Sequence, residues 1–278
     1  MEIIRTKTAL KKALKNFGSK KIALVPTMGF LHDGHLQLVE LAKKSADKVV
    51  VSIFVNPTQF GAGEDFEKYP RDENGDLKKL KALKADIVYI PKITEIYGQH
   101  HGTTIHVQKD ADILCGKFRK GHFDGVATIV AKLLNQVTPD IAIFGEKDYQ
   151  QLHIIREMVS DLDIDTKIIG AKIIREKDGL ALSSRNSYLS KKEREIAPEL
   201  FRTLSVIRGR IEEGEEIKKV ISWGKSSLKK KGFSKIDYIE IRDSKTLEEV
   251  TKIKSTARIF AAAHLGKTRL IDNLEIKS

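Results

Sequence analysis

The chain has 278 residues, of which 41% are hydrophobic, a formal net charge of +12 and a single cysteine, Cys115. No apolar run approaches the ~18 residues that span a bilayer, so we expect no membrane segment. One cysteine excludes an internal disulfide and a multi-cysteine metal site, and this usage favours a cytoplasmic protein. The length suits one large domain or two unequal ones.

The N-terminal segment has the spacing of a short amphipathic helix. Its apolar residues Ile3, Ile4, Leu10, Leu14 and Phe17 recur as one helical face would. The segment lacks the apolar stretch and small-residue cleavage site of a secretory signal. We therefore expect a helix here rather than a targeting sequence.

The first half of the chain alternates short apolar runs with amphipathic stretches. Runs rich in β-branched residues predict strands at 22–25, 49–55, 86–90 and 140–145. Helical spacing occurs at 34–46, 76–84, 127–137 and 149–159. This alternation predicts an α/β fold, with a Rossmann-like parallel sheet domain over residues 1–174. Such sheets bind ligands at the carboxyl ends of their strands, where the loops PTMG, FVNPTQFG and FGEKD would converge.

The second half has a different pattern. Ser190 and Glu193 have the spacing of a capping box, which starts a helix. A lysine-rich helix follows, and then strand-like runs at 236–243, 257–266 and 268–276. Helices followed by strands predict a smaller α+β domain over residues 175–278.

The basic charge is concentrated in this second half. Residues 175–278 contain 24 basic and 16 acidic residues, which raises nucleic acid as a possible partner. The basic runs, such as KKVISWGKSSLKKKG, have helical spacing and few aromatic residues for base stacking. We interpret them as solvated helix faces, or as a field that attracts anionic substrates, and expect no nucleic acid partner.

The segment PTMGFLHDGH, residues 26–35, lies where a strand turns into a helix. Gly34 allows close backbone approach to a ligand, and the N–H groups and dipole of the new helix attract anions. His32 and His35 can donate hydrogen bonds to phosphate oxygens and stabilise the charge of a pentacoordinate phosphorus. The segment supplies no nucleophile, so the attacking group would come from the substrate. A purely structural role is the alternative.

A second signal is the stretch DGLALSSRN. Ser183, Ser184 and Arg185 offer two hydroxyls and a charged fork, a combination that suits a triphosphate. An ordinary surface turn is the alternative. A serine–arginine loop combined with an HxGH motif is the arrangement found in adenylyl-transferring enzymes.

Other motifs are excluded. No GxGxxG follows a predicted strand, and the Gly266-Lys267-Thr268 step lacks the earlier P-loop glycine, since Ala261 stands there. The histidines of HHGTTIH, residues 100–106, have no supporting ligands, so we interpret them as a surface loop rather than a metal site.

These stretches resemble the pantothenate synthetase (pantoate–β-alanine ligase) family of HxGH nucleotidyltransferases. The likeness runs almost end to end, and FVNPTQFG, GEKDYQQL and DGLALSSRN are especially specific. The resemblance implies a two-step reaction. The carboxylate of (R)-pantoate attacks the α-phosphorus of ATP, releasing pyrophosphate and leaving a pantoyl adenylate. The amine of β-alanine then attacks the acyl carbon, releasing AMP and pantothenate.

The resemblance also implies residue roles. His35 would be the proton donor, with His32, Lys147 and Arg185 as further catalytic residues. The ATP contacts would come from Met28, Gly29, Phe30, Leu31, His32, Asp33, Gly34, His35, Gly145, Glu146, Lys147, Asp148, Ile174, Leu182, Ser183, Ser184 and Arg185.

For the other substrates, the resemblance implies that Gln59 and Gln151 hold pantoate and that Gln59 also lies near β-alanine. Mg²⁺ would accompany ATP, held mainly by its phosphates, and Asp148 would meet the ribose or the metal. Weaker assignments are Asn56, Tyr69, Arg119 and His122, in matching motifs. A homodimer is the usual state of the family.

The sequence departs from the family pattern at Phe30, Asp33 and Lys120. None removes a group that the chemistry needs, so substrate preference could shift while the reaction class stays. Two alternatives remain at this point: another HxGH nucleotidyltransferase acting on a phosphorylated acceptor, and an RNA-binding relative of the synthetases.

Overall fold

The structure is a computed structural model that describes residues 1–61, 63–253 and 256–277. The chain divides into two compact units. Unit 1 comprises Met1–Asp112, Arg119–Glu146 and Gln151–Lys172, and unit 2 comprises Ile113–Phe118, Lys147–Gln150 and Ile173–Ser278. The expected domain boundary between residues 174 and 175 stays a prediction.

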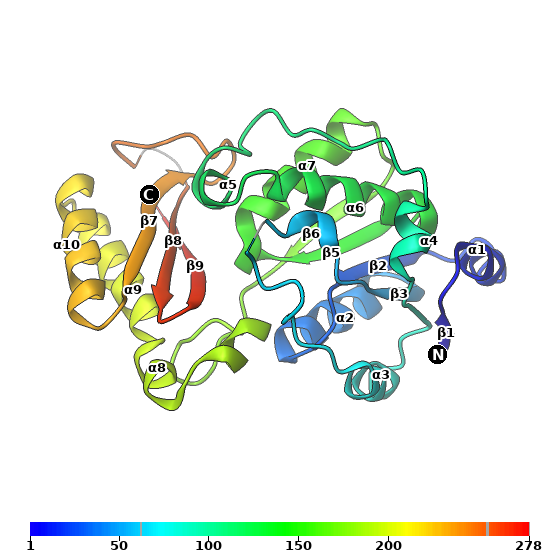
Figure 1. Ribbon diagram of the computed structural model, residues 1–278. Helices are drawn as coiled ribbons and strands as arrows, with labels where there is room; N and C mark the ends of the chain where they lie inside the picture. Colours follow the sequence, from blue (N-terminus) through cyan, green and yellow to red (C-terminus); the bar gives the residue numbers. More distant parts are fainter. Residues whose placement is uncertain (62, 254–255, 278) are drawn as a thin grey trace. The chain divides into compact units, whose positions relative to one another are not determined.

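The described part of unit 1 is built on a six-stranded parallel sheet in the order β1-β4-β3-β2-β5-β6 (Figure 1). Its strands are β1 (Glu2–Ile4), β2 (Ile22–Thr27), β3 (Lys48–Ile53), β4 (Ile87–Tyr89), β5 (Ile141–Gly145) and β6 (Lys167–Ala171). After β2 the chain adds β3 and β4 on one side, then crosses to add β5 and β6 on the other. The order in which strands are added therefore reverses between β2 and β5, and Rossmann-like sheets bind ligands at such a point.

Helices cover both faces of this sheet (Figure 1). They are α1 (Lys7–Lys15), α2 (Asp33–Ser45), η1 (Pro57–Gln59), α3 (Glu73–Ala82), α4 (Ile93–Tyr97) and α6 (His122–Val137), with η2 (Glu146–Asp148) and α7 (Tyr149–Asp161) containing residues of both units. Strand side chains alternate between two cores: Leu24 and Val50 pack with α6 and α7, whereas Val25 and Val51 pack with α2 and α3.

The Rossmann-like α/β prediction is confirmed, and all four predicted strands are present. The predicted inner face of α6, which includes Ile129, Leu133 and Val137, is buried. The prediction for the N-terminus is wrong in part, because Glu2–Ile4 forms β1 beside β4 instead of joining the helix. The helix begins only at Lys7, since the Thr6 hydroxyl accepts a hydrogen bond from the N–H of Ala9 at 3.3 Å and caps it.

Unit 2 contains, in its described part, a three-stranded antiparallel sheet in the order β7-β8-β9. Its elements are α5 (Leu114–Phe118), η3 (Ser184–Tyr188), α8 (Lys191–Ile196), α9 (Glu199–Glu212), α10 (Ile217–Lys230), β7 (Lys235–Asp243), β8 (Ala257–Leu265) and β9 (Thr268–Ile276). Leu204 of α9 and Val220 of α10 pack on one face of the sheet with Ile259. The α+β prediction and the Ser190–Glu193 capping box are confirmed.

The Gly-Lys-Thr step lies in a hairpin. Leu265 pairs with Thr268, so Gly266 and Lys267 form the two-residue turn between β8 and β9. Gly266 has φ 52°, the left-handed backbone that such turns require. The rejection of a P-loop at this position is therefore confirmed.

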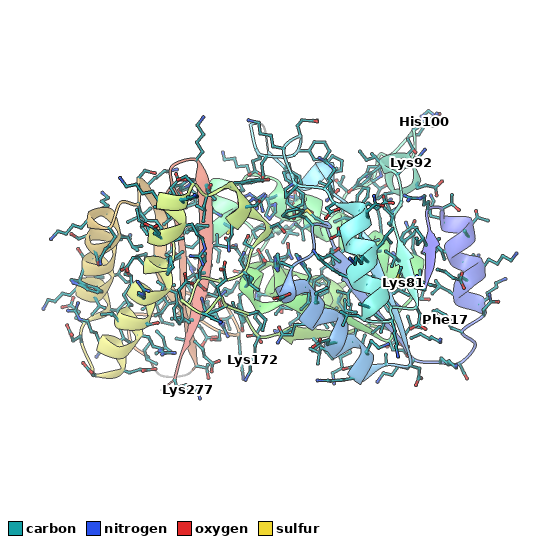
Figure 2. All side chains as sticks on the ribbon, turned by 90° about the horizontal axis from the view of Figure 1, so that it is seen from below. Phe17, Lys81, Lys92, His100, Lys172 and Lys277 are labelled. Atoms are coloured by element: carbon teal, nitrogen blue, oxygen red, sulfur yellow. The ribbon has the colours of Figure 1, made fainter. Side chains whose placement is uncertain are left out.

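The surface carries many of the basic side chains. Lys81, Lys92, Lys172 and Lys277 are exposed, and Figure 2 labels them among the other side chains. The lysines of the run KKVISWGKSSLKKKG are also exposed, which fits the interpretation of this run as a solvated helix face; they are Lys218, Lys219, Lys225, Lys229, Lys230 and Lys231. Across residues 1–61, 63–253 and 256–277, the structure has no helix long and apolar enough to cross a membrane.

Helix α6 approaches η1 so closely that position 125 must be glycine. A Cβ at Gly125 would lie 2.2 Å from the carbonyl oxygen of Thr58. We expect Gly125→Ala to lower the free energy of unfolding by about 1–3 kcal/mol, because the backbone of η1 must move. Urea unfolding followed by circular dichroism measures this.

Gly209→Ala is the matched control. A Cβ at Gly209, in α9, would have no neighbour within 4 Å. Alanine there should raise the free energy of unfolding by up to ~1 kcal/mol through helix propensity. Equal effects of the two substitutions would contradict the packing argument.

Candidate active site

Three predicted site segments follow the three adjacent strands β3, β2 and β5. The segment 28–35 follows β2, residues 56–59 follow β3, and Gly145 and Glu146 end β5 or follow it. The first two segments touch, because the side-chain amide of Gln59 donates to Met28 Sδ at 3.0 Å. Of the three loops predicted to converge, these two are in contact, and the convergence of the FGEKD loop with them stays a prediction.

The turn between β2 and α2 has an unusual backbone. Gly29 and Phe30 have φ angles of 81° and 51°, both in the left-handed region. Gly29 is also tightly enclosed, since a Cβ there would lie 2.9 Å from Ile53 Cγ2. A side chain at position 29 would face both strain and a clash, which explains the glycine of the motif.

Helix α3 holds this turn in place. The buried carboxylate of Asp76 accepts hydrogen bonds from the backbone N–H groups of Phe30 and Leu31, both at 2.7 Å. The ammonium of Lys79 donates to the carbonyl oxygen of Leu31 at 2.6 Å. Burial raises the pKa of Asp76, although both N–H groups and Lys79 oppose that shift. Sequence reasoning missed Asp76; the signal was a carboxylate one helical turn before the buried Leu80.

The two histidines lie at the N-terminus of α2. His32 is the residue before the helix, and its backbone N–H donates to Nδ1 of His35 at 3.3 Å. Since a backbone N–H only donates, Nδ1 of His35 accepts, and the neutral ring carries its proton on Nε2. The two ring centroids are 4.1 Å apart. His35 is therefore held as an Nε2–H donor beside His32, in the first turn of the helix, where the dipole favours negative charge.

Gln59 lies in a connected polar network. Asn56 is buried, and its amide donates to Gln59 Oε1 at 3.2 Å and to the carbonyl of Gly125 at 3.1 Å. The phenol of Tyr97 donates to the side-chain oxygen of Asn56. Burial raises the pKa of Tyr97, so the phenol keeps its proton and acts as a donor at neutral pH. Tyr97 gave no sequence signal, because it lies in a short helix far along the chain.

The two adjacent glutamines of DYQQL have different environments. Gln150 is buried in unit 2, where it accepts from the N–H of Cys115 at 2.9 Å and donates to the carbonyl of Ile113 at 2.8 Å. Gln151 is a partly exposed residue of α7 in unit 1. Gln150 thus has a structural task, which leaves Gln151 as the member of the pair available to a ligand.

Ile174 and the predicted residues from Leu182 to Arg185 belong to unit 2. The N–H of Leu182 donates to the carbonyl of Ile174 at 3.0 Å, which brings these two predicted nucleotide contacts together. Ser183 is the residue before η3 and caps it, because its hydroxyl accepts a hydrogen bond from the N–H of Arg185 at 3.3 Å. Ser184 is buried, and Arg185 follows it in η3.

Lys147 and Asp148 also belong to unit 2. The carbonyl oxygen of Lys147 accepts from the Asn273 amide at 2.9 Å, which ties its backbone to β9. Asp148 is exposed. In the part of the chain that the structure describes, no cluster of three or more His, Cys, Asp or Glu could hold a metal ion.

A family model described as pantoate-beta-alanine ligase matches residues 2–275. The pantothenate synthetase of Rhodospirillum rubrum is 51% identical over 257 residues, which cover 92% of this chain and 91% of the relative. That of Sphingopyxis alaskensis is 49% identical over 278 residues, covering 99% and 100%.

Two solved structures with names of the same kind also match this chain. The crystal structure of pantothenate synthetase from Thermus thermophilus matches with a TM-score of 0.95 and 41% identity, covering 100% of both chains. The pantoate-beta-alanine ligase of Francisella tularensis, complexed with beta-gamma ATP and beta-alanine, matches with a TM-score of 0.80 and 36% identity, covering 99% of this chain and 97% of that one.

The hydrogen bonds that connect Asp76 of α3 to the turn can be tested with Asp76→Asn. An amide keeps the shape but presents an NH₂ group to one of the two backbone N–H donors. We expect the free energy of unfolding at pH 7 to fall by about 1–3 kcal/mol, the cost of an unsatisfied buried group. The exposed Asp163, with φ 49°, is a control, because asparagine tolerates that backbone.

The difference in stability between the wild type and Asp76→Asn should depend on pH. Burial raises the pKa of Asp76 above its ordinary 3.8, so the folded state binds this proton more tightly than the unfolded chain. Its contribution to stability therefore grows as the pH falls through the raised pKa toward 3.8. Urea unfolding should show the advantage of the wild type over Asp76→Asn widening on acidification. A shrinking advantage would contradict the assignment.

Proposed function

Because the chain belongs to the pantoate–β-alanine ligase family, we propose that it joins (R)-pantoate to β-alanine in an ATP-dependent reaction. The products are pantothenate, AMP and pyrophosphate. The observation that carries the mechanism is the turn after the central strand β2, where His32 and His35 begin helix α2. The two relatives described above, at 51% and 49% identity over most of their length, support the same substrates.

In the first step, a carboxylate oxygen of pantoate attacks the α-phosphorus of ATP. The bond from that phosphorus to the bridging oxygen breaks, and pyrophosphate leaves with the electron pair. The Nε2–H of His35 donates to the developing charge, and the N-terminus of α2 adds its dipole. The pantoyl adenylate that results has AMP as a good leaving group.

In the second step, the neutral amine of β-alanine attacks the acyl carbon. The bond from carbon to the phosphate oxygen breaks, AMP leaves, and the amine gives up a proton. No protein nucleophile takes part in either step, which suits loops of histidine, glutamine and asparagine. Gln59 and Gln151 hold pantoate through its hydroxyl and carboxylate groups, and Gln59 is adjacent to the amine.

The nucleotide contacts follow the family pattern. Lys147 and Arg185 neutralise phosphate charge, and Ser183 and Ser184 offer their hydroxyls. The other contacts are Met28 to Asp33 along the turn, Gly34, Gly145, Glu146, Asp148, Ile174 and Leu182. Mg²⁺ enters as the ATP complex, which suits a protein whose described residues include no cluster of three or more metal-ligand side chains. Asp148 is the residue proposed to touch that ion or the ribose.

Two further expectations stay predictions: a homodimer and a cytoplasmic location. Light scattering of the purified protein tests the first, and fractionation of the source cells tests the second.

The reaction can be tested by product release. AMP should form from ATP and Mg²⁺ only when pantoate and β-alanine are both present. Pantoate alone should support exchange of labelled pyrophosphate into ATP, because the first step is reversible. AMP formation that needs no β-alanine would contradict the ligase and favour another nucleotidyltransferase.

His35→Ala should slow pantoate-dependent pyrophosphate exchange about 10²–10³-fold, the usual loss for one donor to transition-state charge. The exposed His106, paired with Asp124 at 2.9 Å, gives the control variant His106→Ala, which should keep the wild-type rate. Thermal unfolding confirms that both variants fold. Near-normal exchange in a folded His35→Ala protein would remove His35 from the mechanism.

A further inference from the structure

We propose that Glu64, Arg119 and His122 form a positioning network that fixes Gln59 and thereby sets the affinity for pantoate. The inference rests on the proposed function, in which Gln59 holds pantoate. All four residues belong to unit 1. None of the three is proposed to touch substrate; each acts through the backbone of Gln59.

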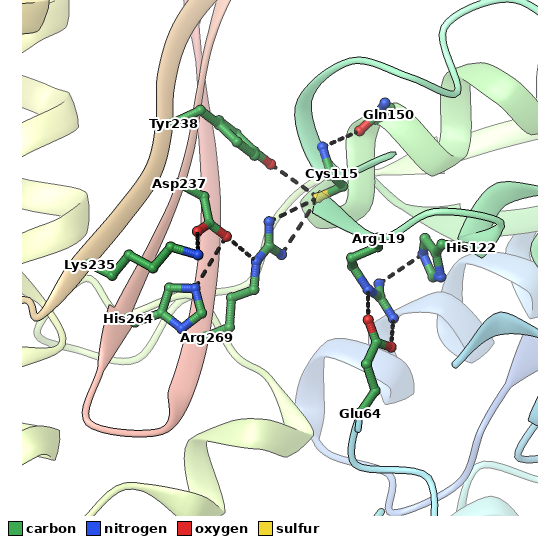
Figure 3. A network of polar contacts seen from close by, with 10 residues as sticks. All are labelled: Glu64, Cys115, Arg119, His122, Gln150, Lys235, Asp237, Tyr238, His264 and Arg269. Atoms are coloured by element: carbon green, nitrogen blue, oxygen red, sulfur yellow. Dashed lines mark hydrogen bonds and ion pairs between the residues drawn. The ribbon is translucent and has the colours of Figure 1, made fainter. Parts of the chain in front are cut away.

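The first link is a two-point ion pair. Arg119 donates from Nε to Glu64 Oε1 at 2.7 Å and from Nη2 to Glu64 Oε2 at 2.6 Å (Figure 3). Both side chains are partly buried, with 17% and 24% of their surfaces exposed. Although burial opposes it, the pair with Arg119 lowers the pKa of Glu64, so the carboxylate stays charged at neutral pH. This geometry fixes the plane of the guanidinium.

The second link fixes the tautomer of His122. Arg119 Nη1 lies 2.9 Å from Nε2 of His122, and Nδ1 of the same ring lies 2.8 Å from the carbonyl oxygen of Gln59 (Figure 3 draws the first contact). A guanidinium only donates and a carbonyl only accepts. The ring is therefore neutral, accepts at Nε2 and donates from Nδ1 to Gln59.

The third link reaches the substrate side chain. Gln59 is the last residue of η1, where carbonyl groups lack helical partners, and His122 supplies the missing donor. Arg119 Nη2 adds a longer contact to the same carbonyl at 3.4 Å. Holding this carbonyl fixes the peptide plane after Gln59, and so the direction of its side chain toward Met28 and Asn56.

The network joins segments that no local rule connects. Glu64 follows η1, whereas Arg119 and His122 flank the start of α6, whose Gly125 already packs on η1. Each hydrogen bond has one possible direction, so the chain from Glu64 to Gln59 has a single arrangement. The Glu64–Arg119 pair thus differs from an isolated surface ion pair, because it is connected through the imidazole of His122 to the carbonyl of Gln59.

The test measures pantoate affinity. Arg119→Ala should raise the Kd for pantoate, by calorimetry, and its KM about tenfold, the loss of roughly 1.4 kcal/mol, while kcat changes less than about threefold. Arg210 is the matched control, because it also makes a two-point pair, with Glu215 at 2.7 and 2.6 Å, in unit 2. Arg210→Ala should leave pantoate affinity unchanged.

A second pair of variants separates positioning from folding. His122→Asn places an amide N–H where Nδ1 lies and should keep the pantoate Kd within about threefold, whereas His122→Phe should raise it about tenfold. This pair decides the matter if Arg119→Ala fails to fold.

Wild-type pantoate affinity in folded Arg119→Ala and His122→Phe would overturn the proposal. So would equal losses in His122→Asn and His122→Phe that follow their melting temperatures, since these indicate a structural role. A wild type that binds pantoate but makes no pantothenate would contradict the proposed function and leave the affinity comparison intact.

Discussion

The parallel pairing of β2 with β3 on one side and β5 on the other is the constraint on which the rest of the structure depends. Ala23 and Leu24 each pair with both neighbouring strands. A shift of β2 by one residue would turn Leu24 and Val25 to the opposite faces of the sheet, away from the cores in which they pack. The register fixes where β2 ends, and hence where the histidine turn begins. Every polar loop of the unit 1 site is placed by the end of one of these three strands.

Much of the fold was predictable, because its signals are local. Four strands of β-branched residues, the apolar face of α6 and the Ser190 cap each lie within a few residues of sequence. The edge strand β1 was missed because three residues carry too little pattern, and Ile3 and Ile4 fit a helical face as well as a strand. Only the pairing with β4, more than eighty residues away, decides between the two.

The motifs of the candidate site could be predicted from the sequence, but the residues that hold those motifs in place could not. The histidines, Gln59 and the serine–arginine stretch belong to short patterns, and their roles stay proposals. Asp76, Tyr97 and Glu64 lie outside those patterns, and their importance depends on contacts across 41 to 55 residues of chain. Such contacts exist only after the sheet has formed. Sequence motifs therefore identify the residues proposed to contact a ligand, but not the residues that position those side chains.

Phe30 gives the histidine turn a thermal weakness. Its left-handed backbone costs about 1–2 kcal/mol in a residue with a side chain, and the bonds from Asp76 offset that cost. The turn is thus held by α3, a helix of ten residues with one fully buried leucine, Leu80. Local opening of α3 would release the turn while the sheet stayed intact. Heating that opened α3 first would inactivate the protein before global unfolding, and hydrogen exchange at Phe30 and Leu31 would report that opening more directly than the melting of the whole protein.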